Sequence, residues 1–286
     1  MSPFIATILV LGLTGLLGAL LLYVVARRFS VAEDPRIESI AALLPGANCG
    51  GCGRKGCRDF ATECVRSGSL AGLYCPVGGE ELMAKVSRII GVDAVAATPM
   101  TAVLRCNGTC AARPLRYDYD GARSCAVMAA VAVGSRGCAY GCLGCGDCVS
   151  ACAFDALRLN PATGLPEVDA DKCVACGKCV GACPRHLLEL RPRGKRERRV
   201  WVACSSGDRG AVARKICASA CIGCGKCART CPFGAIVVSG NLAYIDPALC
   251  RACGKCIGVC PTGAIHATFE LTKPKETTPR DETCNV

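Results

Sequence analysis

Cysteine is the residue type with the most chemical potential in this sequence. The chain has 28 cysteines among 286 residues but only two histidines, His186 and His266. So few imidazoles exclude most catalytic zinc sites and most haem ligation, which depend on histidine. The remaining uses for so many thiols are disulfide bonds or metal centres built from thiolates alone.

Four cysteine runs follow the spacing C-x2-C-x2-C-x3-C of bacterial ferredoxins. In that pattern three thiolates bind one 4Fe-4S cluster and the fourth binds its neighbour, so four clusters in two pairs are expected. Zinc ribbons also use four thiolates, but they have no use for a third cysteine in each run. The expected ligand sets are Cys142, Cys145, Cys148 and Cys183; Cys173, Cys176, Cys179 and Cys152; Cys221, Cys224, Cys227 and Cys260; and Cys250, Cys253, Cys256 and Cys231.

A different set precedes these runs, within the glycine-rich segment NCGGCGRKGC (48–57). Cys64 lies on an expected helix and is interpreted as a bystander. Zinc is a stronger rival here, because this spacing is less distinctive than the ferredoxin pattern. The expected ligands of this fifth cluster are Cys49, Cys52, Cys57 and Cys75.

Six further cysteines have no motif, and two interpretations of them stay open. One is a sixth cluster on Cys106, Cys110, Cys125 and Cys138; the other is that these are buried thiols or spare ligands. We therefore expect five 4Fe-4S clusters, or six if the extra set is real. Cys204 and Cys217 have no assigned role.

The second half of the chain contains a duplication. Six cysteines from Cys125 to Cys152 recur 79 residues later, from Cys204 to Cys231, and the four from Cys173 to Cys183 recur 77 residues later. Each unit has two cysteine loops flanking a hairpin. The expected hairpin strands are 156–159 with 166–169, and 235–238 with 242–245.

The start of the chain predicts a membrane anchor. Residues 3–26 carry no charge and would form a helix of roughly 36 Å, which exceeds a hydrocarbon core of about 30 Å. A cleaved signal peptide is disfavoured because the first residues lack Lys or Arg and no small-residue cleavage site follows. Arg27 and Arg28 place the rest of the chain in the cytoplasm by the positive-inside rule, where disulfides are disfavoured. The expected location is the cytoplasmic (inner) membrane, crossed once.

These features predict an α+β chain with one transmembrane helix, a small cysteine-rich 4Fe-4S domain and two bacterial-ferredoxin-like two-cluster units. A helix is expected to begin after Asp34 and another to end at Gly91. The expected parts are an anchor (1–28), a cysteine-rich domain (29–91), a linker with the extra cysteines (92–124), a first ferredoxin-like unit (125–190), a basic linker (191–216), a second unit (217–270) and a disordered tail (271–286).

The formal charge is +11, and five clusters with their thiolates, each about −2, would bring it to about +1. The segment 185–199 still holds seven Lys or Arg against two Glu. It could dock an acidic electron carrier, contact anionic lipid or be a solvated linker. No nucleotide-binding motif is visible, and nucleic-acid binding is not expected, since Trp201 is the only tryptophan.

Three parts follow one another along the chain: an apolar anchor, then NCGGCGRKGC with the later CPVGG (75–79), then ferredoxin-like runs including CAYGCLGCGDCVSACAFDAL (138–157). In the order of these parts the chain resembles the B subunit of Rnf-type ion-translocating ferredoxin:NAD oxidoreductases. In longer members of that family the position matching Cys145 is often not cysteine, so Cys138 rather than Cys145 could complete the first cluster.

The resemblance implies the iron-sulphur electron-transfer subunit of a membrane translocase. Such a subunit accepts electrons from soluble reduced ferredoxin and passes them to partner subunits that carry flavin and reduce NAD while sodium ions or protons are exported. The residues themselves indicate electron transfer only, because no base, nucleophile or hydride site is visible in this chain. The alternative is an electron-carrying anchor of a hydrogenase or dehydrogenase without ion transport.

Overall fold

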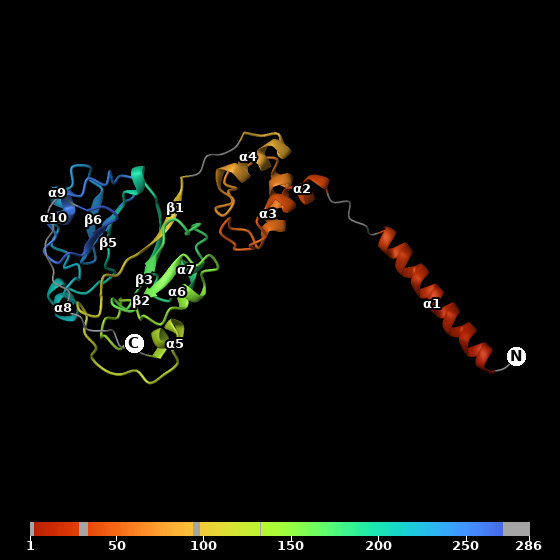
Figure 1. Cartoon of the computed structure of the whole chain (residues 1–286), viewed down its shortest axis with the longest axis horizontal. Coiled ribbons are helices and arrows are strands. Elements are labelled where there is room, and N and C mark those ends of the chain that lie inside the picture. The colour runs from red at the N-terminus through yellow and green to blue at the C-terminus, as the bar shows by residue number, and fades with distance from the viewer. Residues whose placement is uncertain (1–2, 29–33, 94–97, 132, 271–286) are drawn as a thin grey trace.

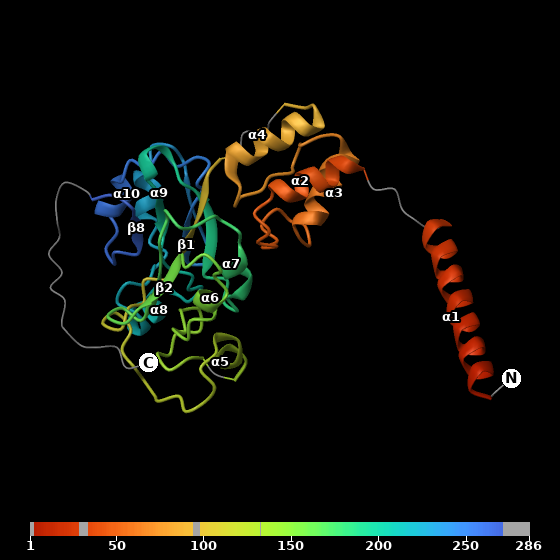
Figure 2. The same cartoon turned by 45° about the vertical axis from the view of Figure 1, so that its right-hand side comes forward.

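The computed structural model describes residues 3–28, 34–93, 98–131 and 133–270, and these fall into four parts. Helix α1 (Pro3–Arg28) stands apart from the other elements in two views (Figures 1 and 2). Among residues whose side chains the structure describes, no helix is long and apolar enough to cross a membrane. The tail expected to be disordered, with Cys284, lies outside the described residues.

The cysteine-rich domain consists of three helices, α2 (Pro35–Leu43), α3 (Cys57–Ser67) and α4 (Gly79–Ile90). The expected start of α2 is confirmed, because the Asp34 carboxylate accepts a hydrogen bond from the Arg36 backbone N–H. The expected end of α4 at Gly91 is confirmed too, since this glycine adopts the left-handed conformation with φ 82°. Ile40, Phe60 and Met83 form a fully buried core that holds the three helices together.

The first ferredoxin-like unit is built from two antiparallel strand pairs and three short helices. Its strands are β1 (Met100–Leu104), β2 (Leu157–Asn160), β3 (Leu165–Val168) and β4 (Leu188–Pro192), with β2 paired to β3 and β1 paired to β4. The hairpin agrees with the expected strands to within one residue. Its helices are α5 (Cys125–Val131), α6 (Asp147–Ser150) and α7 (Lys178–Ala182).

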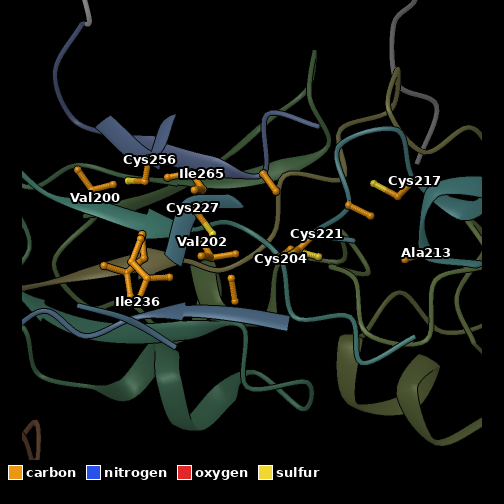
Figure 3. Packing of buried hydrophobic residues seen from close by; sticks show 14 residues of the cluster. Val200, Val202, Cys204, Ala213, Cys217, Cys221, Cys227, Ile236, Cys256 and Ile265 are labelled. Carbon is orange, nitrogen blue, oxygen red and sulfur yellow. The ribbon is translucent and has the colours of Figure 1, made fainter. Parts of the chain in front are cut away.

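The second unit repeats this plan. Its strands are β5 (Val200–Val202), β6 (Ile236–Ser239), β7 (Leu242–Ile245) and β8 (Ile265–Ala267), paired β6 with β7 and β5 with β8. Val202, Ile236 and Ile265 pack around Cys227 and Cys256 in its core (Figure 3). Its helices are the 3-10 turn η1 (Lys195–Glu197), α8 (Gly210–Ile216), α9 (Lys226–Thr230) and α10 (Lys255–Gly258).

The two expected linkers are wrong in part, because each contains a strand that completes a unit. In the segment 92–124, β1 pairs with β4 from Met100–Pro192 to Leu104–Leu188. In the segment 191–216, β5 pairs with β8 from Val200–Ala267 to Val202–Ile265. The units therefore begin at β1 and β5, earlier than the expected 125 and 217. These strands are short and their partners lie far along the chain, so the local sequence pattern does not reveal them.

The duplication also needs a correction at its start. Cys106 follows the end of β1 by two residues, and Cys204 follows the end of β5 by two residues. Cys106, and not Cys125, is thus the structural counterpart of Cys204. The segment before the next shared cysteine is 31 residues in the first unit (107–137) and 12 in the second (205–216). Cys125 lies in this longer segment, and its 79-residue offset from Cys204 is a coincidence.

Candidate metal centres

The N-terminal ligand set is brought together as the spacing predicts. Cys49, Cys52, Cys57 and Cys75 line one pocket between the 44–57 loop and the segment after Leu73. The Asn48 side-chain oxygen accepts a hydrogen bond of 2.8 Å from the Cys57 N–H, which fixes the loop against the start of α3.

Cys64 does not line this pocket. Its side chain is fully buried in the helical core, and burial raises its pKa to about 11. These properties fit a packing thiol, as expected for a bystander.

A second pocket in the first unit is lined by Cys152, Cys173, Cys176 and Cys179. Burial, followed by the neighbouring thiols, raises the pKa of Cys179 to about 11. The Ala102 N–H of β1 lies 3.5 Å from the Cys173 sulphur and donates to it. The strand missed by the sequence pattern therefore contributes directly to a ligand site.

The other pocket of the first unit is lined by Cys142, Cys148 and Cys183 together with Cys125. Cys145 forms a hydrogen bond with Cys125, so five thiols gather at this site. Cys138 does not line this pocket. The fourth ligand is therefore either Cys145, as the spacing predicts, or Cys125, which the spacing does not assign to this site.

Asp147 explains how Cys125 reaches this pocket. Its carboxylate accepts hydrogen bonds from the Cys125 N–H (2.9 Å), the Ala126 N–H (3.1 Å) and the Ser124 hydroxyl (3.0 Å). Burial raises the pKa of Asp147, but these hydrogen bonds outweigh it and leave the pKa below its usual value. In the sequence, Asp147 stands out only as an acidic residue within a cysteine run. Its partner Cys125 lies 22 positions earlier, so no local pattern connects the two residues.

In the second unit the thiols also meet as the spacing predicts. Cys227 is close enough to Cys221, Cys260 and Cys224 for each to raise its pKa, after burial. Burial raises the pKa of Cys256 to about 12, with Cys250 and Cys253 adding to the effect. The pKa of Cys250 is raised by burial and by Cys231, which completes that set.

The expected extra set of Cys106, Cys110, Cys125 and Cys138 is not assembled. Cys125 belongs to the Cys142 pocket, and the Cys110 sulphur lies 3.4 Å from the Thr163 carbonyl oxygen. Cys106 and Cys138 instead line a pocket with Cys204 and Cys217 from the second unit. Linear spacing could not find this grouping, because its members come from both units.

The residues present fit 4Fe-4S clusters by their donor chemistry. Each of the three pockets described above offers four thiols and no imidazole or carboxylate ligand. Four glycines directly follow the second cysteine of their runs and adopt φ between 71° and 86°, which favours glycine: Gly146, Gly177, Gly225 and Gly254. Among the described residues, no group of three or more His, Cys, Asp or Glu side chains is arranged to hold a single metal ion, so the thiols are gathered around pockets and not around one atom.

The basic segment 185–199 is less of a surface patch than expected. Arg185 donates to the carbonyl oxygens of Cys138 (2.8 Å) and Gly141 (2.6 Å), so it holds the loop before Cys142. Arg191 and Arg199 are buried and pair with Glu189 and Glu197 respectively. The exposed cations in this segment are Lys195, Arg196 and Arg198.

Two protein families match parts of the chain. The 4Fe-4S dicluster domain family matches residues 141–187, 172–235 and 220–264. The putative Fe-S cluster family matches residues 44–70, which contain Cys49, Cys52 and Cys57. Both matches fall on the cysteine sets described above.

Three relatives are similar to this chain over more than four fifths of its length. The B subunit of a Na(+)-translocating ferredoxin:NAD(+) oxidoreductase complex from Acetobacterium woodii is 42% identical over 237 residues, which cover 83% of this chain and 70% of the relative. The B subunit of a proton-translocating ferredoxin:NAD(+) oxidoreductase complex from Clostridium ljungdahlii is 39% identical, covering 87% and 86%. The B subunit of an ion-translocating oxidoreductase complex from Methanosarcina acetivorans is 38% identical, covering 86% and 91%. This chain therefore belongs to the family of B subunits of Rnf-type ion-translocating ferredoxin:NAD oxidoreductase complexes.

Proposed function

We propose that this chain is the iron-sulphur subunit that takes electrons from reduced ferredoxin and passes them to partner subunits that reduce NAD while ions are exported. The five cysteine sets assigned from spacing, with Cys125 or Cys145 as the fourth ligand beside Cys142, would hold 4Fe-4S clusters. Bound there, such clusters supply reversible one-electron storage at low potential. The chain itself supplies the thiolates, their insulation and their order in space.

The observation that carries this proposal is the direct contact between the N-terminal domain and the first unit. A Cβ atom at Gly51 would lie 2.8 Å from the Cys176 Cα and 2.9 Å from the Pro76 side chain. Only a residue without a side chain allows this approach. Cys176 and Cys52 belong to different ligand sets, so Gly51 brings two sets together across a domain boundary.

Electron uptake fits the end of the second unit. Helices α9 and α10 pack against each other and lie at the end of the molecule far from α1 (Figures 1 and 2). Cys224 and Cys253, beside these helices, are the two ligand thiols in the described chain that are exposed. Exposed cations lie within five residues of them in the chain: Lys226, Arg229, Arg251 and Lys255. These cations would attract an acidic electron carrier to the surface where two ligand thiols are exposed, so the electron would cross a short distance to the cluster.

The anchor remains a proposal from the sequence. Helix α1 is 26 residues long, has no charged residue before Arg27 and exposes large apolar side chains from Phe4 to Val25. Exposed apolar surface on this scale is unfavourable in water and is removed in a bilayer. With Arg27 and Arg28 on the cytoplasmic side, the iron-sulphur domains would face the ferredoxin pool.

The experiment that tests the function is anaerobic reduction of the purified complex by ferredoxin. Reversing the charge of Lys226, Arg229, Arg251 and Lys255 to Glu is expected to raise the apparent KM for ferredoxin at low salt and to have little effect at high salt. The matched control reverses Lys195, Arg196 and Arg198 and leaves the KM unchanged. A raised KM in the control alone would move docking to the 185–199 segment, and reduction of the clusters by NADH alone would refute the direction of transfer.

A further inference from the structure

Four cysteines outside every ferredoxin-type run surround one pocket between the two units. Cys106 and Cys138 come from the first unit, and Cys204 and Cys217 from the second. All four are buried, with exposures of 8%, 9%, 9% and 8% respectively. The hollow measures about 400 Å³ including solvent-filled space, against 430, 310 and 310 Å³ for the three pockets lined by motif cysteines. It is therefore of the size class of the expected cluster sites.

The two units are tied together around this pocket. The Trp201 indole N–H donates to the Leu104 carbonyl (2.9 Å), and the Ser219 hydroxyl donates to the Asn107 carbonyl (2.6 Å). The Ala218 N–H donates to the Ala112 carbonyl (2.8 Å). These bonds fix the segments that carry Cys106 and Cys217 relative to each other, so the four thiols form a built site.

Backbone N–H groups point at the sulphur atoms in the same way on both sides. Cys106 accepts from the N–H of Gly108, two residues on, and from the N–H of Cys142, both at 3.4 Å. Cys204 likewise accepts from the N–H of Ser206, two residues on, and from the N–H of Cys221. Such bonds stabilise a thiolate far more than a neutral thiol, and they are a usual means of tuning iron-sulphur clusters.

Arg113 is a buried cation that lines this pocket, and the one carboxylate in the same lining, Asp208, is hydrogen-bonded to Ser206 and not paired with Arg113. Arg113 is 3% exposed; its Nη2 donates to the Cys142 carbonyl oxygen (2.5 Å), but its Nε has no hydrogen-bond partner and it forms no ion pair within the described residues. A Cβ atom at Gly141 would lie 2.2 Å from the Arg113 Nη1 and 3.2 Å from the Cys138 sulphur, so the guanidinium and the thiol share this space. Leaving a charge buried and unpaired is costly, and an anionic group bound by the thiols would remove that cost.

We propose that Cys106, Cys138, Cys204 and Cys217 hold a further 4Fe-4S cluster that bridges the two ferredoxin-like units. A cluster with four thiolates carries about −2 and would therefore supply the anionic partner that Arg113 lacks. Because Cys142 and Cys221 donate to Cys106 and Cys204, the site lies between the first ligand sets of the two units. Only its part in electron transfer rests on the proposed function; its ligation does not.

The test is the number of clusters per chain in the anaerobically purified full-length protein. Native mass spectrometry and iron analysis are expected to give six clusters and about 24 irons. Cys138→Ala and Cys217→Ala are each expected to lose about four irons, or to convert one cluster to a three-iron form with its own EPR signal. The double variant is expected to lose no more than either single variant, because both residues would serve one cluster.

The matched control is Cys64→Ala, a buried thiol that lines none of the four cysteine pockets described above, which keeps the full iron content. Five clusters in the unmodified chain, or unchanged iron and EPR spectra in both single variants, would overturn the proposal even if a variant folded poorly. The proposed function fails separately, if a fully loaded chain is not reduced by ferredoxin.

Discussion

Asp147→Asn tests whether a single carboxylate positions Cys125 beside the first cluster site. One oxygen of Asp147 accepts from the Cys125 N–H, and the other accepts from the Ala126 N–H and the Ser124 hydroxyl. Asparagine keeps only one of these acceptors, so at least one N–H at the start of α5 loses its partner. Helix α5 has only seven residues and depends on such a cap. We expect a local destabilisation of about 1–2 kcal/mol.

Anaerobic hydrogen exchange of the Cys125 and Ala126 amides measures this directly. A loss of about 1–2 kcal/mol corresponds to roughly 5- to 30-fold faster exchange when local opening governs the rate. Asp120→Asn is the matched control, because Asp120 is exposed in the same segment and accepts no hydrogen bond that the described chain shows. Unchanged exchange at both amides in Asp147→Asn, or equal acceleration in the control, would refute the reasoning.

Two other predictions address electron transfer and pH. Gly51→Ala should slow reduction of the N-terminal cluster without changing iron content, because its methyl group would push Cys176 away. The control is Gly181→Ala, at a position where a methyl group meets open space. Equal reduction rates in the two variants would contradict the contact. His266 lies edge-on to Trp201 at 6.0 Å, and burial lowers its pKa below 6.5, so the unfolded chain binds its proton first as the pH falls. The free energy of unfolding should therefore decrease from pH 6.5 down to the pKa of His266 in the folded chain, by about 1.4 kcal/mol for each unit by which folding lowers that pKa. In urea titrations, His266→Phe should remove that part of the pH dependence. An identical pH dependence in wild type and variant would contradict it.

The ligand sets that spacing assigned were predictable because their information is local. Each run places two thiols on a loop and the third in the short helix that follows, and the glycine after the second cysteine permits the left-handed turn between loop and helix. The hairpins were predictable for the same reason, since Leu157–Asn160 and Leu165–Val168 are joined by a short loop.

What was missed depends on contacts between distant segments. The strand Val200–Val202 is only three residues long and is recognisable only beside Ile265–Ala267. Cys125 carried no sign of its site, because Asp147 brings it there from another segment. The sequence shows only that Arg185 and Arg191 are positively charged. In the fold, Arg185 donates to backbone carbonyl oxygens and Arg191 is buried beside Glu189. Composition predicts a charge, but the fold decides whether it reaches solvent.

If the function proposed here is right, the thiols of this chain hold iron-sulphur clusters that ferredoxin can reduce. The most direct measurement mixes the anaerobically purified full-length chain with reduced ferredoxin and follows its visible absorbance together with bound iron and acid-labile sulphide. We expect a brown protein with equal iron and sulphide, whose colour is bleached by reduced ferredoxin and not by NADH alone. A colourless protein with bound zinc, or with thiols open to alkylation, would contradict this expectation.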